Sequence, residues 1–308
     1  MEYIKGTTEF KIEKSSVISL GKFDGIHKGH ELLLEHMMKK KEEGLSTVLF
    51  TFDVPPRPDS LQENQKVLTT NEEKMQICES EGIDYLIECP FTPEIMHMEA
   101  EHFIQMLVER LHMKCVVVGT DFHFGHNRGG DYRLLEQCAK KFSYEVIVVD
   151  KVQYEQRDIS STFIREEVLK GEMACAAYLL GYDYFVQGIV MHGRQMGGPV
   201  LGIPTVNVIP PANKLLPPFG VYVCEVVVGE QVFPGIADVG CKPTIEGDNP
   251  VAVEAHIFDF NQNLYDKEVR ILFKERVRAE LKFDSLEALK EQLQQDIAFG
   301  RYYFRTKN

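Results

Sequence analysis

Two histidines mark the stretch of the chain whose residue types most readily support chemistry, Gly21-Lys-Phe-Asp-Gly-Ile-His27-Lys-Gly-His30. Residues three apart share one face of a helix, so His27 and His30 could act on the same ligand. The first turn of a helix also offers free N–H groups and the positive end of the helix dipole, which favour phosphate. Gly29 allows close approach of a ligand to the backbone. These residues could therefore hold a phosphate group and stabilise the charge that develops during its transfer.

The same stretch can also be interpreted as a tight turn whose histidines only cap a helix. Its context favours a binding site, because an apolar strand-like segment, Ser16–Leu20, precedes it and a helical pattern, His30–Lys41, follows it. The chain contains no Walker A sequence, G-x-x-x-x-G-K-[ST]. Any ATP would therefore bind without a P-loop.

A second group of polar residues lies in Ile159-Ser-Ser-Thr162-Phe-Ile-Arg165. Ser161 and Thr162 would open a helix, with Arg165 one turn later. Hydroxyl groups, free N–H groups and a guanidinium group would then converge on an anion. The alternative is an ordinary N-cap serine with a surface arginine.

Asp121 and Phe122 directly follow a predicted strand. In a parallel sheet, ligands lie outside the carboxyl ends of the strands, which makes both residues candidates for a binding role. Phe122 could equally belong to the hydrophobic core.

Hard oxygen ligands are present in the stretch Gly202-Ile-Pro204-Thr205-Val-Asn207. In a strand, Thr205 and Asn207 point to the same face. A hydroxyl group and an amide carbonyl suit Mg²⁺ and the phosphates of a nucleotide. The alternative is a Gly/Pro loop that leads into a barrel strand with a satisfied threonine and asparagine.

A carboxylate that could serve as a general base lies in Glu254-Ala-His256, within another predicted strand. Glu254 could accept the proton of a substrate hydroxyl group as that group attacks a γ-phosphate. The alternative is a polar, outward-facing side of a strand.

The elements that must position these residues differ between the two parts of the chain. Up to about residue 150, strand-like and helix-like segments alternate, which predicts an α/β fold with a parallel sheet covered on both faces. Thr70 and Glu73 form a predicted capping box that opens a helix, which Gly82 ends. Besides the two segments named above, the predicted elements are strands at Ser46–Phe52, Asp84–Glu88, Cys115–Val118 and Tyr144–Val149, and helices at Glu99–Leu111 and Tyr132–Lys141.

The second part begins after a helical region, Ser161–Leu180, that is broken near Gly171. No helical period intervenes between its strands, which indicates a small antiparallel barrel or sandwich. A last amphipathic helix, about Ser285–Ala298, would pack on it. We place the boundary at residues 1–181 and 182–308. The predicted strands are Phe185–His192, Val221–Val228, Val232–Val239, Val251–Phe260 and Glu268–Phe273.

Composition limits the classes of partner. The 308 residues carry a net charge of −13 and no basic run longer than Lys39–Lys41, so nucleic acid is an unexpected partner. No apolar run of about 18 residues occurs, and Met1–Phe10 lacks the apolar core of a signal peptide. The seven cysteines are widely spaced, which is typical of buried or idle thiols. We expect a cytoplasmic monomer or weak oligomer that acts on small molecules.

The motifs together resemble those of the prokaryotic bifunctional riboflavin kinase/FMN adenylyltransferase (FAD synthetase) family, from about Ser16 to Asp296. Residues 21–30 resemble G-N-F-D-G-x-H-x-G-H, whose H-x-G-H is shared with the nucleotidyltransferase superfamily. Residues 119–131 are similar to G-x-D-F-x-F-G-x-x-R-x-G-D, residues 159–165 to I-S-S-T-x-I-R, and residues 51–57 to T-F-x-P-H-P. In the second part, the similar motifs are G-F-P-T-A-N and E-V-H, with Pro218–Tyr222 and Arg278–Phe283 also fitting the family.

The resemblance implies a Rossmann-like nucleotidyltransferase domain followed by a β-barrel riboflavin kinase domain with a C-terminal helix. The barrel would phosphorylate riboflavin to FMN with Mg²⁺ and ATP, and the first domain would convert FMN and ATP to FAD and pyrophosphate. It implies catalytic roles for His27, His30 and Glu254, and metal ligation by Thr205 and Asn207. It further implies ATP or phosphate binding by Gly21, Phe23, Asp24, Gly29, Ser161, Thr162, Arg165, Gly202, Pro204, Thr205 and Asn207, and flavin binding by Asp121, Phe122, Tyr222 and Arg278.

The chain departs from the family pattern at Lys22, Pro55 and Asp238, where the family has Asn, His and Asn. These differences leave three alternatives to a bifunctional enzyme. The first is a riboflavin kinase with a weak or silent adenylyltransferase domain, which would accumulate FMN. The second is a flavin-binding regulator, which would bind flavin without consuming ATP. The third is a nucleotidyltransferase that acts on another phosphate compound.

Overall fold

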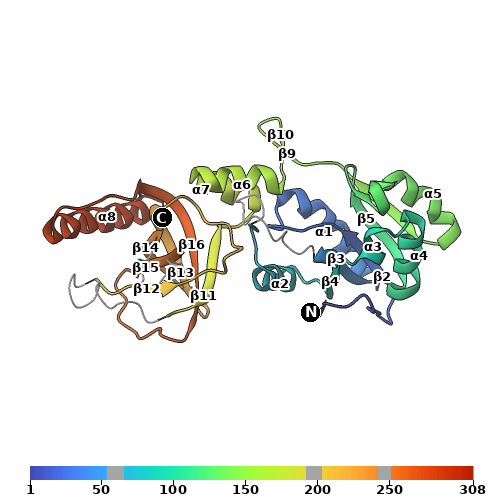
Figure 1. The fold of residues 1–308 in the computed structure, drawn as a ribbon, viewed down its shortest axis with the longest axis horizontal. Coiled ribbons are helices and arrows are strands. Elements are labelled where there is room, and N and C mark those ends of the chain that lie inside the picture. Colours follow the sequence, from blue (N-terminus) through green and yellow to red (C-terminus); the bar gives the residue numbers. More distant parts are fainter. Residues whose placement is uncertain (54–65, 192–202, 242–250, 308) are drawn as a thin grey trace. The chain divides into compact units, whose positions relative to one another are not determined.

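The computed structural model describes residues 1–53, 66–191, 203–241 and 251–307 (Figure 1). The chain divides into two compact units, Met1–Ser161 and Thr162–Asn308. Pro55 and Gly202 lie outside the described residues, as does most of the glycine-rich stretch before Pro204. The boundary predicted from the sequence, at residues 181 and 182, lies about 20 residues beyond this division and stays a prediction for the functional domains.

The first unit is built on a six-stranded sheet with the order β1-β4-β3-β2-β5-β8. Every neighbouring pair in this sheet is parallel. The central strand reads Ser-Val-Ile-Ser-Leu and is buried along its whole length, as expected for a strand covered on both faces. The strands are β1 (Glu2–Lys5), β2 (Ser16–Leu20), β3 (Ser46–Asp53), β4 (Tyr85–Pro90), β5 (Met113–Gly119) and β8 (Glu145–Val149).

Helices cover both faces of this sheet, which confirms the predicted α/β class (Figure 1). On one face, Leu33 and Met37 of α1 pack in a single cluster with Cys78 of α2 and with strand residues. On the other face, Leu107 of α4 and Leu135 of α5 belong to a second cluster. The helices are α1 (Lys28–Glu42), α2 (Asn71–Ser80), α3 (Pro93–Met96), α4 (Ala100–Leu111) and α5 (Tyr132–Phe142).

The strand order reverses at β2. From β2 the chain proceeds outward through β3 to β4, and β5 then returns to the other side of β2. The carboxyl ends of β2 and β5, at Leu20 and Gly119, flank this switch point. Ligands of open α/β sheets bind at such a point. The two motifs that begin at Gly21 and Gly119 therefore lie at the position that the topology favours for a ligand.

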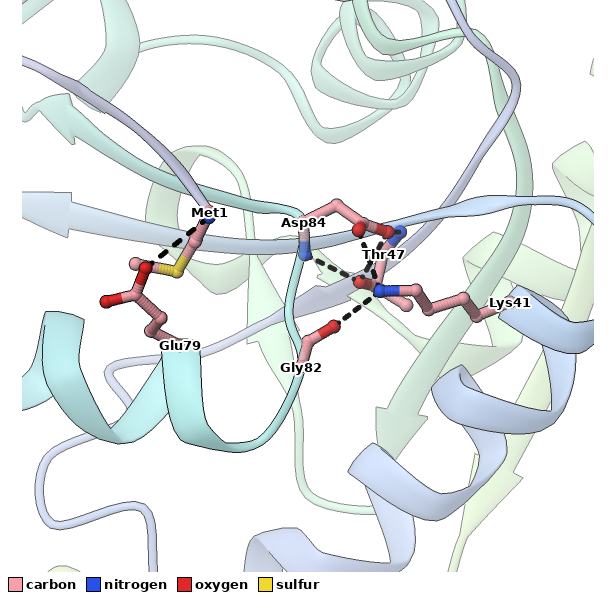
Figure 2. Close-up of polar contacts among 6 residues, drawn as sticks. All are labelled: Met1, Lys41, Thr47, Glu79, Gly82 and Asp84. Carbon is pink, nitrogen blue, oxygen red and sulfur yellow. Dashed lines mark hydrogen bonds and ion pairs between the residues drawn. The ribbon is translucent and has the colours of Figure 1, made fainter.

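A polar cluster secures the opposite, amino-terminal edge of the sheet (Figure 2). Asp84 accepts hydrogen bonds from the backbone N–H and the hydroxyl of Thr47, at 2.9 and 3.0 Å. Lys41, near the end of α1, donates to Asp84 and to the Gly82 carbonyl, both at 2.7 Å. Partial burial alone would raise the pKa of Asp84, but these hydrogen bonds hold it below its ordinary value. The cluster ties α1, β3 and the turn before β4 together.

Two short hairpins complete the first unit. In one, β6 (His123–Phe124) pairs with β7 (Gly130–Asp131) around a 3₁₀ turn at His126–Arg128. In the other, β9 (Gln153–Tyr154) pairs with β10 (Arg157–Asp158), and this hairpin leads the chain into α6. Figure 1 shows the β9–β10 hairpin projecting beyond the sheet.

The second unit contains α6, α7 and a six-stranded antiparallel sheet with the order β11-β16-β13-β14-β15-β12. An antiparallel bridge between Met191 and Asn207 joins the two outer strands and nearly closes the sheet into a barrel, which confirms the barrel prediction. The elements are α6 (Ser161–Lys170), α7 (Met173–Leu180), β11 (Phe185–Ile189), β12 (Val206–Val208), β13 (Gly220–Val228), β14 (Gln231–Cys241), β15 (Val251–Ile257) and β16 (Glu268–Ala279).

The last helix, α8 (Leu286–Lys307), packs on the barrel. Its Asp296 carboxylate is 2% exposed and accepts hydrogen bonds from the Arg278 guanidinium of β16 at 2.6 to 3.1 Å. Ile297 and Phe304 of the same helix pack on Phe258. A buried bidentate ion pair and an apolar contact therefore fix α8 to the strands.

Most predicted elements are confirmed within one or two residues, and the largest differences lie in the second unit. Helix α8 runs to Lys307, nine residues beyond its predicted end, and β16 runs to Ala279, beyond Phe273. The edge strand β1 is absent from the sequence prediction, because only its pairing with β4 makes this polar segment a strand. Within the described residues, no helix is both long and apolar enough to cross a membrane.

Candidate active sites

The loop between β2 and α1 has an unusual backbone. Phe23, Gly25 and Ile26 all have positive φ angles, of 47°, 93° and 38°. Glycine adopts this region freely, but a β-branched residue such as Ile26 does so only under strain. Such strain persists where the surroundings impose it and is concentrated at functional sites.

Asp24 holds this loop in place. Its carboxylate accepts hydrogen bonds from the backbone N–H groups of Leu68 and Thr69, at 2.8 and 3.2 Å. The Thr69 hydroxyl in turn accepts from Gly25 N–H at 3.1 Å. The Ser161 hydroxyl donates to the Asp24 carbonyl at 2.8 Å. Asp24 therefore connects the loop, the segment before α2 and the start of α6, and direct ATP contact by its side chain stays a prediction.

The two predicted histidines lie against each other at the start of α1. His27 is the N-cap residue, and its backbone N–H donates to Nδ1 of His30 at 3.2 Å. The two rings stack with their centroids 3.9 Å apart and their planes 20° apart. The Phe23 ring lies 5.2 Å from the His30 ring and packs over Gly21. The structure therefore brings four of the predicted site residues into direct contact.

Gly29 has no room for a side chain. A Cβ atom at this position would lie 2.8 Å from Nδ1 of His27 and 2.9 Å from the Ile159 carbonyl oxygen. Both distances are shorter than any normal contact, and one involves backbone that cannot easily move. Gly29 thus allows the Ile159–Ser161 segment to pack directly on the first turn of α1.

Burial keeps both histidines neutral. It lowers the pKa of His27 to about 4, and it lowers the pKa of His30 well below its ordinary value, with a further effect from His27. The Nδ1 atom of His27 is buried without a hydrogen-bond partner among the described residues. A buried polar atom left unpaired is costly and rarely tolerated without a functional reason. At neutral pH these rings can donate hydrogen bonds to a phosphate group without carrying charge.

Thr162 and Arg165 follow on the first turns of α6, which begins at Ser161. The division between the two compact units falls between Ser161 and Thr162. Convergence of Thr162 and Arg165 with the histidines therefore stays a prediction, whereas the contact of Ser161 with the loop lies within the first unit.

Asp121 and Phe122 lie just after the carboxyl end of β5. Lys151, which follows β8, forms ion pairs with Asp121 at 3.1 Å and with Asp158 at 3.0 Å. The Phe122 ring stacks on Phe124 at 5.5 Å and is only partly buried against the core. Both residues are therefore at the switch-point edge, and flavin binding by them stays a prediction. No sequence pattern indicates a role for Lys151, since an isolated lysine near a hairpin is typical of a surface.

In the barrel, the predicted kinase residues face one another across three neighbouring strands. Asn207 of β12 and Asp238 of β14 are the direct register partners of Glu254 on β15. Direct partners in an antiparallel sheet share a face with Cβ atoms about 5 Å apart. The Thr205 hydroxyl lies 3.5 Å from Oε2 of Glu254, and Nδ1 of His256 lies 2.9 Å from the Pro204 carbonyl oxygen.

This set of side chains is chemically suited to Mg²⁺ and a nucleotide. A hydroxyl, an amide carbonyl and a carboxylate are hard oxygen donors, which Mg²⁺ prefers together with phosphate oxygens and water. Asn207 is 7% exposed, so its position is fixed, whereas Glu254 is only partly buried and can reach a substrate. The donor set on this face therefore fits a magnesium nucleotide beside a general base.

Asp238, where the family pattern has Asn, adds a second carboxylate next to Glu254. A Cβ atom on Gly240 would overlap a carboxylate oxygen of Glu280 and would lie 3.5 Å from one of Asp238, so these two carboxylates are also neighbours. The side chain of Asp238 reaches solvent but is crowded by protein. Loss of hydration and the charges of Glu280 and Glu254 raise its pKa to about 6.

Tyr222 and Arg278 are the predicted flavin-binding residues of the barrel. Their side chains form contacts within the second unit. Tyr222 is fully buried, and its hydroxyl donates to the Pro218 carbonyl at 2.6 Å. Arg278 forms the ion pair with Asp296 that fixes α8. Flavin contact by either residue stays a prediction.

Two family models match the chain: one for FAD synthetase over residues 9–163, and one for riboflavin kinase over residues 180–304. The bifunctional riboflavin kinase/FMN adenylyltransferase of Buchnera aphidicola is 34% identical over 99% of both chains. The Escherichia coli protein of the same name is 32% identical, over 95% of this chain and 94% of its own.

A solved Streptococcus pneumoniae structure, described as a macrolide-efflux protein, has the same fold. It is 31% identical, covers 96% of each chain and has a TM-score of 0.84. The full-length relatives and the two family models agree with the motifs at the two candidate sites. The chain therefore belongs to the bifunctional riboflavin kinase/FMN adenylyltransferase family.

Proposed function

We propose that the two candidate sites of this chain carry out successive reactions: phosphorylation of riboflavin to FMN, and adenylylation of FMN to FAD. The observation that carries this proposal is that each unit assembles its own set of phosphate-directed groups. In the first unit, His27, His30 and Ser161 meet at one loop. In the second, Asn207 and Glu254 share one face of the barrel.

In the kinase reaction, Glu254 accepts the proton of the riboflavin 5′-hydroxyl while the oxygen attacks the γ-phosphate of ATP, and ADP leaves. Thr205 and Asn207 offer the oxygen ligands for Mg²⁺, which when bound neutralises charge on the phosphates. The closeness of the Thr205 hydroxyl to Glu254 supports this arrangement, because a base at Glu254 would then act beside a metal ion held by Thr205. Pro204 would bring the backbone close to ATP, and ATP binding by Gly202, which lies outside the described residues, rests on the family resemblance.

In the adenylyltransferase reaction, a phosphate oxygen of FMN attacks the α-phosphate of ATP, and pyrophosphate leaves. The FMN phosphate is already ionised, so no general base is needed. His27, His30 and Ser161 would donate hydrogen bonds to the reacting phosphates. For the Thr162 hydroxyl group and the positive charge of Arg165, the family resemblance is the support. Gly21, Phe23, Asp24 and Gly29 shape the loop that presents these donors.

The predicted flavin-binding residues differ in the support that they have. Asp121 and Phe122 lie at the switch-point edge of the first unit, which supports a role there. For Tyr222 and Arg278, the family resemblance is the only support, because their side chains are engaged elsewhere. The cytoplasmic location and the monomeric or weakly oligomeric state remain predictions.

The test is to incubate the protein with riboflavin, ATP and Mg²⁺ and to separate the flavins by chromatography. We expect FMN first and FAD afterwards. Glu254→Gln should block FMN formation from riboflavin but leave FAD formation from added FMN intact, and His30→Ala should do the reverse. Glu268→Gln, at the start of β16, is a matched control that should retain both reactions.

Each other result points to one alternative. FMN without FAD would indicate a kinase with a silent first unit. Flavin binding without ATP consumption would indicate a regulator. If neither FMN nor FAD forms and no flavin binds, the proposed function is wrong.

A further inference from the structure

Lys74 is a buried cation close to the adenylyltransferase loop. It lies in the first turn of α2 and is only 8% exposed. A positive charge in the first turn opposes the helix dipole, and removing an ammonium group from water is costly without good partners. Both the position of Lys74 in the helix and its burial are therefore unfavourable, and both require an explanation.

The hydrogen bonding of Lys74 is incomplete among the described residues. An ammonium group has three donors. Its one hydrogen bond in this part of the chain is to the Lys22 carbonyl oxygen, at 3.4 Å, which is long. That carbonyl also accepts from the Thr51 hydroxyl at 3.4 Å. The bond is too weak to account for burying the charge.

The buried carboxylates of the same unit are held by other donors. Glu73 accepts from Thr70 N–H at 2.8 Å in the capping box. Glu88 accepts from Asn71 at 3.1 Å and from the Tyr3 hydroxyl. Asp24 accepts from the two N–H groups before α2, and no ion pair links Lys74 to any carboxylate within the described ranges. The charge of Lys74 is therefore not balanced by these groups.

The position of Lys74 indicates what could balance it. Helices α1 and α2 pack on the same face of the sheet, and both begin at its carboxyl edge. The Lys22 carbonyl that Lys74 contacts belongs to the loop that presents His27 and His30, and the adjoining Phe23 ring touches His30. An anion that binds at this loop would supply the acceptors that the ammonium group lacks.

We infer that Lys74 binds a phosphate group of FMN or ATP during adenylyl transfer, an inference that rests on the proposed location of that reaction. Adenylyl transfer brings two negatively charged groups together, so a cation held beside them favours their approach. Both substrates offer phosphate oxygens to the ammonium group, and titrating each substrate separately shows which of them Lys74 binds.

The test measures FAD formation with FMN and MgATP varied separately, for the wild type, Lys74→Met and Lys74→Arg. We expect Lys74→Met to raise the KM of one substrate at least tenfold, which identifies the phosphate that is bound, and Lys74→Arg to retain most of the affinity. Lys39→Met, on the exposed side of α1, is the matched control. FMN formation from riboflavin reports that the second unit of each variant is folded, and the melting temperature reports whether the first unit is.

If the wild type binds nucleotide without forming FAD, that result contradicts the proposed function but not the inference about Lys74. Calorimetric titration with ATP and with pyrophosphate then tests the inference. Weaker binding of either probe to Lys74→Met would then support the role of Lys74. Unchanged KM values and binding constants in Lys74→Met would overturn it. An equal loss in Lys74→Arg and Lys74→Met, accompanied by a lower melting temperature in both, would show that Lys74 only supports the loop.

Discussion

Asn207 and Glu254 lie directly opposite each other on β12 and β15 of the barrel. Asn207 is also bridged to Met191 at the seam of the barrel, so its position depends on closure of the sheet. An amide and a carboxylate on one face, with the Thr205 hydroxyl 3.5 Å from the carboxylate, place the proposed metal ligands next to the proposed base. Binding of the magnesium nucleotide and removal of the substrate proton are therefore expected to be separable by mutation.

Replacing Asn207 by leucine should weaken the binding of the magnesium nucleotide and leave the proposed base, Glu254, in place. Loss of one buried oxygen donor to a charged ligand costs about 1.5–3 kcal/mol, or roughly a 10- to 150-fold rise in the KM for MgATP. The magnesium concentration needed for half-maximal FMN formation should rise as well, while the KM for riboflavin changes little. The measurement is the initial rate of FMN formation at varied magnesium and ATP.

Asn261→Leu, in an exposed loop, is the control for introducing an apolar side chain into this unit. If the magnesium dependence of Asn207→Leu matches that of the wild type, Asn207 is not a metal ligand.

Gly29→Ala should lower the rate of FAD formation about 100-fold and spare FMN formation. The new methyl group would overlap the His27 ring and the Ile159 carbonyl, so either the ring or the Ile159–Ser161 segment must move. A displacement of about 1 Å in a transfer site can cost about 100-fold in rate. Rates of both reactions, measured on one protein sample by flavin chromatography, provide the comparison.

Glu31→Ala changes an exposed residue in the same turn of α1 and should leave both rates unchanged. Wild-type rates of FAD formation in Gly29→Ala would mean that the close packing of this turn is unimportant for the reaction.

The sequence predicted most of the frame because local patterns determine it. Buried strands such as Ser16–Leu20 are continuous apolar runs, and the capping box of Thr70 and Glu73 marks the start of α2 as expected. The strand β1 was missed because pairing with β4, more than 80 residues away, makes Glu2–Lys5 a strand. Partners at such a distance leave no local pattern.

The sites were predicted in part, for a related reason. The motifs made His27, His30, Thr205, Asn207 and Glu254 candidates, and the structure groups them at two places, but the motifs did not show that Asp238 lies opposite Glu254. That relationship depends on the register of β14 against β15, which only the folded sheet defines. Lys74 carries no sequence signal either, since a lysine in a helix is usually exposed. Burial, like register, is a property of the tertiary structure.

The neutral histidines should make the first unit sensitive to acid. The pKa of His27 is about 4 in the folded protein and about 6.5 when unfolded. Between these values the unfolded chain binds more protons, so stability is complete above pH 6.5 and falls as the pH drops towards 4. The loss attributable to His27 is on the order of 2–3 kcal/mol. Urea unfolding between pH 4 and pH 7 measures it.

His27→Asn should flatten this dependence, whatever its effect on stability at neutral pH. His102→Asn removes an exposed histidine of α4 and serves as the control for the loss of an imidazole. Equal slopes for His27→Asn and the wild type would show that His27 is protonated as easily in the folded protein as in the unfolded chain.

Asp238→Asn should stabilise the barrel unit above pH 6 and leave it unchanged near pH 3. Crowding and the charges of Glu280 and Glu254 raise the pKa of Asp238 to about 6, from an ordinary value of 3.8. Between these values the folded protein binds more protons than the unfolded chain, so stability declines as the pH rises through this window and stays lower above it. Asparagine is never charged, so the stability of Asp238→Asn should not decline in this pH range.

Thermal unfolding of Asp238→Asn and the wild type should therefore give curves that coincide in acid and separate between pH 4 and pH 6, with the variant melting higher at pH 7. Solvent screening should reduce this difference in melting temperature, because the Asp238 side chain is exposed. Asp284→Asn, an exposed change beyond β16, is the control, and its melting temperature should follow that of the wild type at every pH. A lower melting temperature for Asp238→Asn at pH 7 would mean that the Asp238 carboxylate forms a favourable contact that outweighs its repulsion by Glu254 and Glu280.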